Sequence, residues 1–212
     1  MTIEFIVNML ARWGHLLFGI TWIGILYYFN FIQGGYFKQA SPEGLADAKS
    51  KLAPSALWWF RWAAMFTFIT GVILLYGVDK NGQMNSYIVS GATMGTFMFL
   101  NVWLVIWPKQ KIVLGMVEGD TASAGAAAGL ASRTNTLFSG PMVFCMLAGP
   151  HFAGYAKAIS TSANSMYVAL GVIVLIELNG LFGKQGPMTS VKGVITSSLV
   201  LTAILVYILQ MM

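Results

Sequence analysis

Charged residues are scarce in this 212-residue chain: Asp, Glu, Lys and Arg make up only 9 % of it, against about 25 % in an average soluble domain. Hydrophobic residues account for 57 %. A soluble fold of this composition would have too few polar residues to cover its surface. The composition therefore excludes a soluble enzyme, a nucleic-acid-binding domain and a disordered chain. It indicates a polytopic membrane protein.

Cysteine and histidine are almost absent as well. The one cysteine, Cys145, lies in an apolar run, which excludes an intramolecular disulfide and a zinc site built from cysteines. The two histidines, His15 and His151, have no acidic or thiol neighbour in the sequence. They are too few for a closed zinc or copper site. The net charge of +5 is not gathered into a basic stripe, so no nucleic-acid partner is expected.

Long apolar runs without alternation predict membrane-spanning helices rather than the strands of a barrel. Six runs approach the length of about 20 residues that crosses the hydrocarbon core. These runs are 4–34, 56–78, 87–107, 134–151, 165–182 and 191–211. The fourth contains Gly140 and Pro141 and is expected to be kinked. The prediction is a single all-α domain of about six transmembrane helices, with a flexible cytoplasmic loop over 108–133.

The distribution of basic residues predicts the orientation. Nine of the twelve lie in, or at the helix ends beside, the connections that follow the first, third and fifth runs. Under the positive-inside rule these connections are cytoplasmic, so both termini face the periplasm. The predicted location is the bacterial inner membrane, where the lipid bilayer surrounds the chain.

Ionisable residues at membrane depth are costly and usually have a function. His15 and His151 fall in the same half of the membrane, as the two axial ligands of haem b would. Gly19, one turn after His15, leaves room for a flat macrocycle, and Gly149 would do the same beside His151. Arg12, one turn before His15, would pair with a propionate. The alternative is that His15 only hydrogen-bonds to a neighbouring helix and that His151, which follows Gly149 and Pro150 at a helix end, is an exposed loop residue.

A second group of polar residues is predicted in the inner half of the membrane. Glu177 and Arg61 lie there, so ion pairing or protonation of Glu177 is expected. Asn101 and Arg133 fall at similar depth. The group indicates either a polar pocket open to the cytoplasm or a structural network between helices.

Three stretches together resemble a known family. They are 15–24 (HLLFGITWIG), 56–62 (ALWWFRW) and 132–142 (SRTNTLFSGPM), and Asn101 with 106–108 (IWP) adds a weaker match. This pattern, from Arg12 to about His151, is similar to the membrane domain of the bacterial urate oxidase (urate hydroxylase) family.

The resemblance implies an integral membrane enzyme that oxidises urate to 5-hydroxyisourate and passes electrons to cytochrome c rather than directly to oxygen. It strengthens the expectation of haem b on His15 and His151. Arg61, Asn101 or Arg133 would hold the anionic purine, and Glu177 would move a proton.

Family members usually carry a periplasmic cytochrome c domain at the C-terminus. No Cys-x-x-Cys-His occurs in these 212 residues, so no c-type haem attaches to them. A separate periplasmic cytochrome c or a larger membrane complex is therefore the expected partner.

Two other functions stay open. The first is a non-catalytic subunit, haem-bearing or structural, of a larger membrane complex. The second is a haem-b enzyme similar to the membrane protoporphyrinogen oxidases, whose first helix also carries a histidine followed by tryptophan and other aromatic residues. A transporter is disfavoured because the chain shows no internal repeat.

Overall fold

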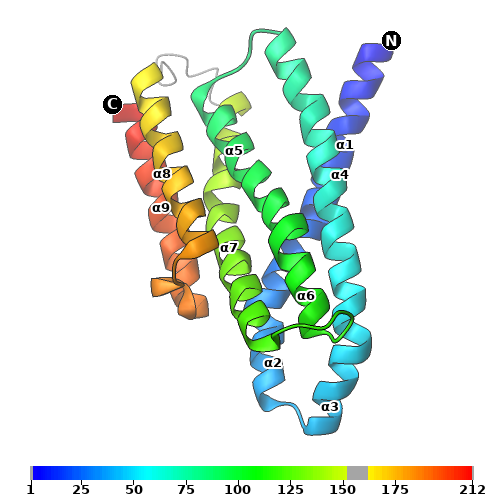
Figure 1. Ribbon diagram of the computed structural model, residues 1–212. Coiled ribbons are helices and arrows are strands. Elements are labelled where there is room, and N and C mark those ends of the chain that lie inside the picture. Colours follow the sequence, from blue (N-terminus) through cyan, green and yellow to red (C-terminus); the bar gives the residue numbers. More distant parts are fainter. Residues whose placement is uncertain (1, 152–161, 212) are drawn as a thin grey trace. The chain divides into compact units, whose positions relative to one another are not determined.

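The computed structural model describes residues 2–151 and 162–211, and every regular element in them is helical (Figure 1). Three long helices each contain a stretch of π-helix, and three others are continuous α-helices. The composite helices are α1 (Ile3–Tyr27), η1 (Tyr28–Gln33) and α2 (Gly34–Gln39); α3 (Pro42–Asp47), η2 (Ala48–Leu52) and α4 (Ala53–Lys80); and α5 (Ser86–Leu100), η3 (Asn101–Ile106) and α6 (Trp107–Val113). The others are α7 (Thr121–His151), α8 (Ala163–Phe182) and α9 (Val191–Met211), with a short 3₁₀ helix, η5 (Gly186–Thr189), before α9.

Five of these helices are long and apolar enough to cross a membrane. They are Ile3–Gln39, Pro42–Lys80, Ser86–Val113, Ala163–Phe182 and Val191–Met211. The predicted all-α, multi-pass membrane protein is thereby confirmed, and five of the six predicted runs match these helices. The sixth, 134–151, is helical but lies in α7, which is not among the five. Its buried Thr134, Asn135, Thr136 and Ser139 make it more polar than the rest.

The connection expected as a loop over 108–133 is mostly helical. The helix α6 continues to Val113 and α7 begins at Thr121, so only 114–120 lie outside helices. Asp120 caps α7, because its Oδ1 accepts hydrogen bonds from the backbone N–H of Ala122 (3.0 Å) and of Ser123 (3.3 Å). Alanine has the highest helix propensity, which explains why this small-residue stretch is helical.

The small side chains at the start of α7 form a packing face. Ala124, Ala128 and Ala131 follow each other at helical spacing, and all three are buried. Small residues of this kind let a neighbouring backbone approach closely.

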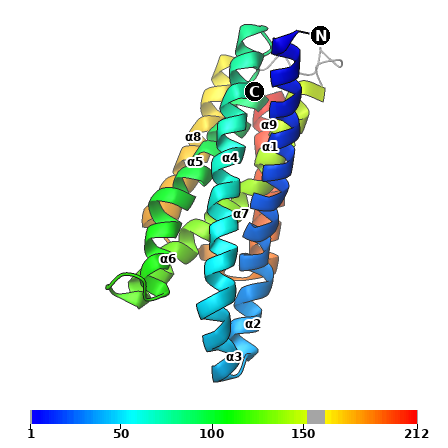
Figure 2. The ribbon, with the colours of Figure 1, turned by 90° about the vertical axis from the view of Figure 1, so that its right-hand side faces the viewer.

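The chain divides into two compact units. The first consists of Met1–Leu74 and Phe99–Ser132, and the second of Leu75–Met98 and Arg133–Met212. In the first unit, α1 lies beside α4 (Figure 2). The rings of Phe18 and Phe66 are 5.0 Å apart there. The element η3 packs against α4, where the ring of Trp103 contacts that of Trp62 edge-on with 5.6 Å between the ring centres.

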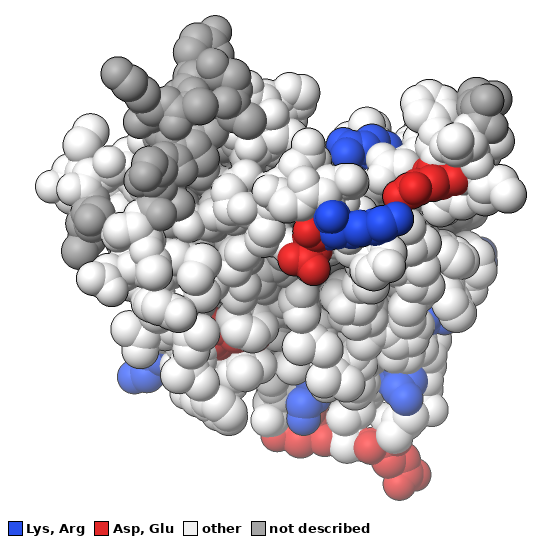
Figure 3. All heavy atoms as spheres, turned by 90° about the horizontal axis from the view of Figure 1, so that it is seen from above, with Lys and Arg blue, Asp and Glu red and all other residues white. Residues whose placement is uncertain are grey.

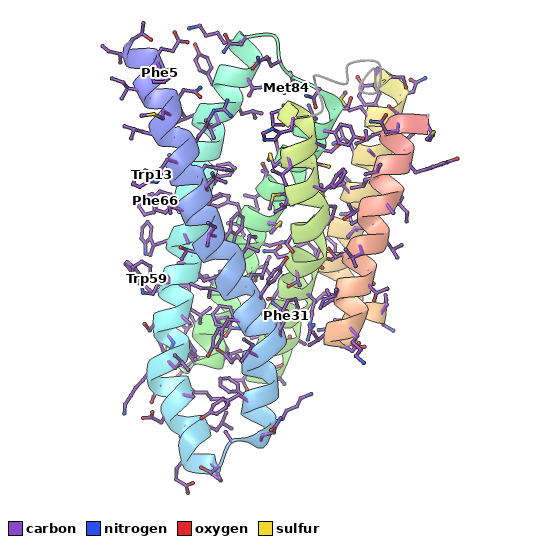
Figure 4. All side chains as sticks on the ribbon, turned by 180° about the vertical axis from the view of Figure 1, so that it is seen from behind. Phe5, Trp13, Phe31, Trp59, Phe66 and Met84 are labelled. Atoms are coloured by element: carbon purple, nitrogen blue, oxygen red, sulfur yellow. The ribbon has the colours of Figure 1, made fainter. Side chains whose placement is uncertain are left out.

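The outer faces of the helices are apolar, as lipid requires. Trp13 of α1 and Trp59 and Phe66 of α4 are exposed and project to one side of the first unit (Figure 4). The view from above in Figure 3 shows the end of the molecule instead, where Lys, Arg, Asp and Glu side chains appear among uncharged residues. Exposed apolar side chains on membrane-spanning helices are lipid contacts rather than a defect of packing.

In the second unit, α8 and α9 run side by side and are joined through η5 (Figure 1). Glycines allow close approach between its helices. A Cβ atom added at Gly180 of α8 would lie 2.6 Å from Oγ1 of Thr134 in α7, and one added at Gly140 of α7 would meet the hydroxyl of Ser198 in α9. Close glycine contacts of this kind hold membrane helices together where the hydrophobic effect does not.

Replacing Gly180 with alanine is expected to destabilise the protein by about 1–3 kcal/mol, the usual cost of overpacking. Gly171, on the same helix, is the matched control because a Cβ added there meets nothing within 4 Å. Thermal unfolding in detergent should show a lower midpoint for Gly180→Ala and an unchanged or higher one for Gly171→Ala. Equal midpoints would mean that α8 and α7 are not closely packed at Gly180 and Thr134.

Candidate functional site

His15 is held against α4 by a group of small and hydroxyl-bearing residues, which we call the His15 site: His15, Thr67, Thr70 and Gly71. The Nδ1 atom of His15 lies 2.9 Å from the backbone carbonyl oxygen of Thr67 and 3.2 Å from Oγ1 of Thr70. A Cβ atom added at Gly71 would lie only 3.1 Å from Cε1 of the imidazole. The imidazole ring of His15 therefore packs against α4 at Gly71, where the absence of a side chain leaves room for it.

The hydrogen bond to Thr67 determines which nitrogen of His15 carries the proton. A carbonyl oxygen only accepts hydrogen bonds, so Nδ1 must donate. In the neutral ring, Nε2 then keeps its lone pair, and no described residue hydrogen-bonds to it. Histidines that bind metals typically donate their other ring N–H to a carbonyl or carboxylate in this way. The donor chemistry of His15 thus fits a residue that would hold haem iron through Nε2.

Gly19 and Arg12, which the sequence predicts to take part in haem binding beside His15, lie on the same helix, α1. A Cβ atom added at Gly19 would meet nothing nearer than a methyl group of Thr67 at 4.0 Å, so there is open space beside this residue. Arg12 is exposed, and its Nε donates a hydrogen bond to Oδ1 of Asn8 at 2.8 Å. No described carboxylate pairs with its guanidinium, which leaves it available to an anionic group.

His151 is placed differently. It is exposed at the last residue of α7, in the second unit, whereas His15 belongs to the first. The room expected beside it at Gly149 is occupied, because a Cβ atom there would lie 2.5 Å from a side-chain carbon of Ile88. The glycine therefore serves the packing of α5 against α7. Ligation of one haem by both histidines stays a prediction.

Two of the predicted substrate-binding residues are cations with unusual surroundings. The guanidinium of Arg61 stacks on the ring of Trp107, 3.9 Å from its centre. Arg133 has a buried Nη1 atom that no described residue accepts a hydrogen bond from. A buried donor without a partner costs about 1–3 kcal/mol, and more when it is charged. An anionic ligand would remove that cost at Arg133.

The other two predicted residues are buried. Asn101 is the first residue of η3 in the first unit, and Glu177 is 6 % exposed in α8 of the second unit. Arg61 belongs to the first unit and Arg133 to the second, so pairing of Arg61 with Glu177 stays a prediction. No cluster of three or more His, Cys, Asp or Glu side chains is suited to a metal ion within 2–151 and 162–211.

Sequence reasoning did not find the residues that hold His15. Thr67 and Gly71 are small residues four apart on an apolar helix, a pattern that marks close contact between membrane helices. That pattern was the available signal. Three further buried polar groups were not predicted from the sequence. The indole N–H groups of Trp22 and Trp103 and the Oε1 atom of Gln33 are buried and have no hydrogen-bond partner among the described residues.

Comparison with known proteins agrees with the resemblance. The model of the family "Urate oxidase N-terminal" matches residues 80–210, more than half of the chain. The match includes Asn101, Arg133, His151 and Glu177 and leaves out the His15 site. No curated protein and no solved structure matches the chain. The chain therefore belongs to the urate oxidase N-terminal family.

Proposed function

We propose that this chain is a membrane haem-b oxidoreductase that oxidises urate to 5-hydroxyisourate, with His15 as a ligand of the haem iron. The observation that carries the proposal is the hydrogen bond from Nδ1 of His15 to the carbonyl oxygen of Thr67. It fixes the ring on α4 and leaves Nε2 with a free lone pair. When bound, haem b supplies a one-electron redox centre.

Arg12 and His151 complete the proposed haem site. Arg12 would bind a propionate through its guanidinium, which no described carboxylate neutralises. His151 would be a second residue that holds the haem iron, and its exposed position at the end of α7 leaves its ring nitrogens accessible. His15 is the ligand whose tautomer the surrounding residues determine, so we expect it to contribute more of the binding.

The substrate side of the proposal rests on the two cations. Arg133, with its unpartnered buried donor, would hold the anionic oxygen of urate, and Arg61 and Asn101 would add further hydrogen bonds. Oxidation adds the oxygen of one water molecule to urate and releases two protons and two electrons. Glu177 would accept a proton. The electrons would leave one at a time for a periplasmic cytochrome c, alone or as part of a larger membrane complex.

The test combines haem content with turnover. Purified protein should give a b-type pyridine haemochrome and a reduced-minus-oxidised spectrum, and urate should reduce added cytochrome c. His15→Ala should lose most of the haem, because it removes a ligand of the iron, and with it all urate-dependent reduction. Tyr76→Ala, which removes an exposed aromatic ring from α4, is the control and should keep both.

Three results would decide between this proposal and its alternatives. Well-folded protein without haem would overturn the proposal outright. If the His15→Ala variant still binds haem as the unmodified chain does, His15 is not a ligand of the iron. A haem-loaded protein that does not oxidise urate, beside an active control enzyme, would contradict the enzymatic assignment and leave a haem-bearing subunit of a larger complex.

A further inference from the structure

The turn between α8 and α9 borders an open hollow of about 340 Å³ in the second unit. Its wall is largely apolar and includes Leu137 of α7 and Leu175 and Ile176 of α8. Polar residues line it near the end of α8 (Asn179), in the turn (Lys184 and Gln185) and on α9 (Ser197). The hollow thus has an apolar wall and a polar end that carries one positive charge.

Hydrogen bonds and close backbone contacts hold the turn beside the hollow. Nδ2 of Asn179 donates to the carbonyl oxygen of Lys184 at 3.1 Å, and its Oδ1 accepts from the N–H of Lys184 at 3.4 Å. A Cβ atom at Gly193 would collide with the backbone of Pro187. The N–H of Gly193 also donates to Oγ of Ser190 at 2.9 Å. These contacts preserve the space beside the turn.

The position of the turn places Lys184 at the surface of the membrane. The helix α8 has 20 residues, which at 1.5 Å per residue is about 30 Å, the thickness of the hydrocarbon core. Lys184 follows the last residue of α8 by two positions and therefore reaches the headgroup region. Leu175, which lines the hollow, is also 67 % exposed, so the apolar wall continues onto the lipid-facing surface of α8.

The ammonium group of Lys184 is free to bind an anion. Its backbone makes the two hydrogen bonds with Asn179, and no described carboxylate forms an ion pair with its side chain. A cation at headgroup level beside an apolar wall is complementary to a molecule with a phosphate next to a hydrocarbon chain. The predicted orientation also puts this turn on the cytoplasmic side, where anionic lipids gather.

We propose that the hollow binds one anionic phospholipid, with its phosphate on Lys184 and the upper part of an acyl chain against Leu175 and Ile176. Asn179 is committed to the backbone of the turn and acts as a positioning residue. Ser197 of α9 and Gln185 of the turn are the other polar side chains of the lining. This site is independent of the haem and urate assignments, because every residue in it belongs to the second unit and none is assigned to them.

The test measures retained lipid by native mass spectrometry of the full chain in detergent. Phosphatidylglycerol and phosphatidylcholine are offered as separate titrations, and glycerol 3-phosphate is the arm that represents a free phosphate. We expect one phosphatidylglycerol per chain and about a five-fold preference over phosphatidylcholine, the factor that one lysine contributes at an anionic surface. Lys184→Gln should remove this preference.

Two further variants make the result specific. Lys192→Gln removes an equal charge from the first turn of α9, outside the lining of the hollow, and should keep the preference. Ser197→Leu fills the hollow and should reduce retention of both lipids, while circular dichroism and thermal unfolding confirm that the variant is folded. Equal retention of the two lipids by the unmodified chain would overturn the proposal. So would an equal effect of Lys192→Gln and Lys184→Gln, or binding of glycerol 3-phosphate without lipid.

Discussion

Replacing Gly71 with leucine is expected to weaken haem binding by about ten- to hundred-fold, the usual effect of disturbing the groups that orient a metal ligand. A single added carbon at Gly71 would already lie 3.1 Å from Cε1 of His15 and 3.5 Å from its Nδ1. A leucine side chain must therefore push the imidazole off α4 and away from the carbonyl oxygen of Thr67. Haem titration of the purified apoprotein, followed in the Soret band, measures the loss.

Two companion variants separate orientation of His15 from general damage. Gly71→Ala adds one carbon atom, whereas Gly71→Leu adds four. The haem affinity of Gly71→Ala should therefore lie between those of the unmodified chain and of Gly71→Leu. Gly171→Leu adds the same bulk where a Cβ atom meets nothing within 4 Å, and its haem affinity should be unchanged. Haem affinity in Gly71→Leu equal to that of the unmodified chain would show that the position of His15 on α4 does not matter for binding.

Replacing Arg133 with methionine is expected to raise the KM for urate by about ten- to hundred-fold, since a hydrogen bond to a charged group contributes roughly 1.5–3 kcal/mol. Methionine keeps an unbranched apolar stem but removes the guanidinium, whose Nη1 is buried without a partner among the described residues. Haem content should stay constant. Steady-state reduction of cytochrome c at varied urate concentrations measures KM and kcat separately.

Stability provides a second readout for Arg133, because a structural arginine and a ligand-binding arginine respond in opposite ways. Removing a guanidinium whose buried Nη1 has no partner among the described residues should leave the ligand-free protein as stable as before or more so. Lys49→Met, which removes an exposed cation in η2, is the control and should change neither KM nor stability. A marked loss of thermal stability in Arg133→Met, with unchanged KM, would mean that Arg133 holds helices together.

The course of the helices was largely predictable because lipid allows few alternatives. A run of about 20 apolar residues has to satisfy its backbone groups internally. Run length does not show where a helix continues beyond the apolar part. For that reason the extension of the third helix to Val113 and the start of α7 at Thr121 were missed. The π-helical stretches η1, η2 and η3 were missed because they differ from α-helix in hydrogen-bond register, which hydropathy does not encode.

Candidate site residues were predictable where the residue type is itself rare at membrane depth. His15 and Arg133 stand out in an apolar sequence, and the structure gives each a notable environment. The partners of His15 were not predictable in the same way, since Thr67, Thr70 and Gly71 are ordinary residues of membrane helices. They reach His15 through the rotation of α4 about its own axis relative to α1, which depends on packing over the full length of both helices.

The most direct test of the central claim, ligation of haem by His15, is chemical rescue of His15→Gly with free imidazole. If His15 is a ligand of the iron, this variant binds haem poorly or in an altered spin state. Added imidazole should restore the optical spectrum of the unmodified protein, because it would occupy the space left beside Gly71 and donate to the carbonyl oxygen of Thr67. A normal haem spectrum in His15→Gly before any imidazole is added would contradict the claim.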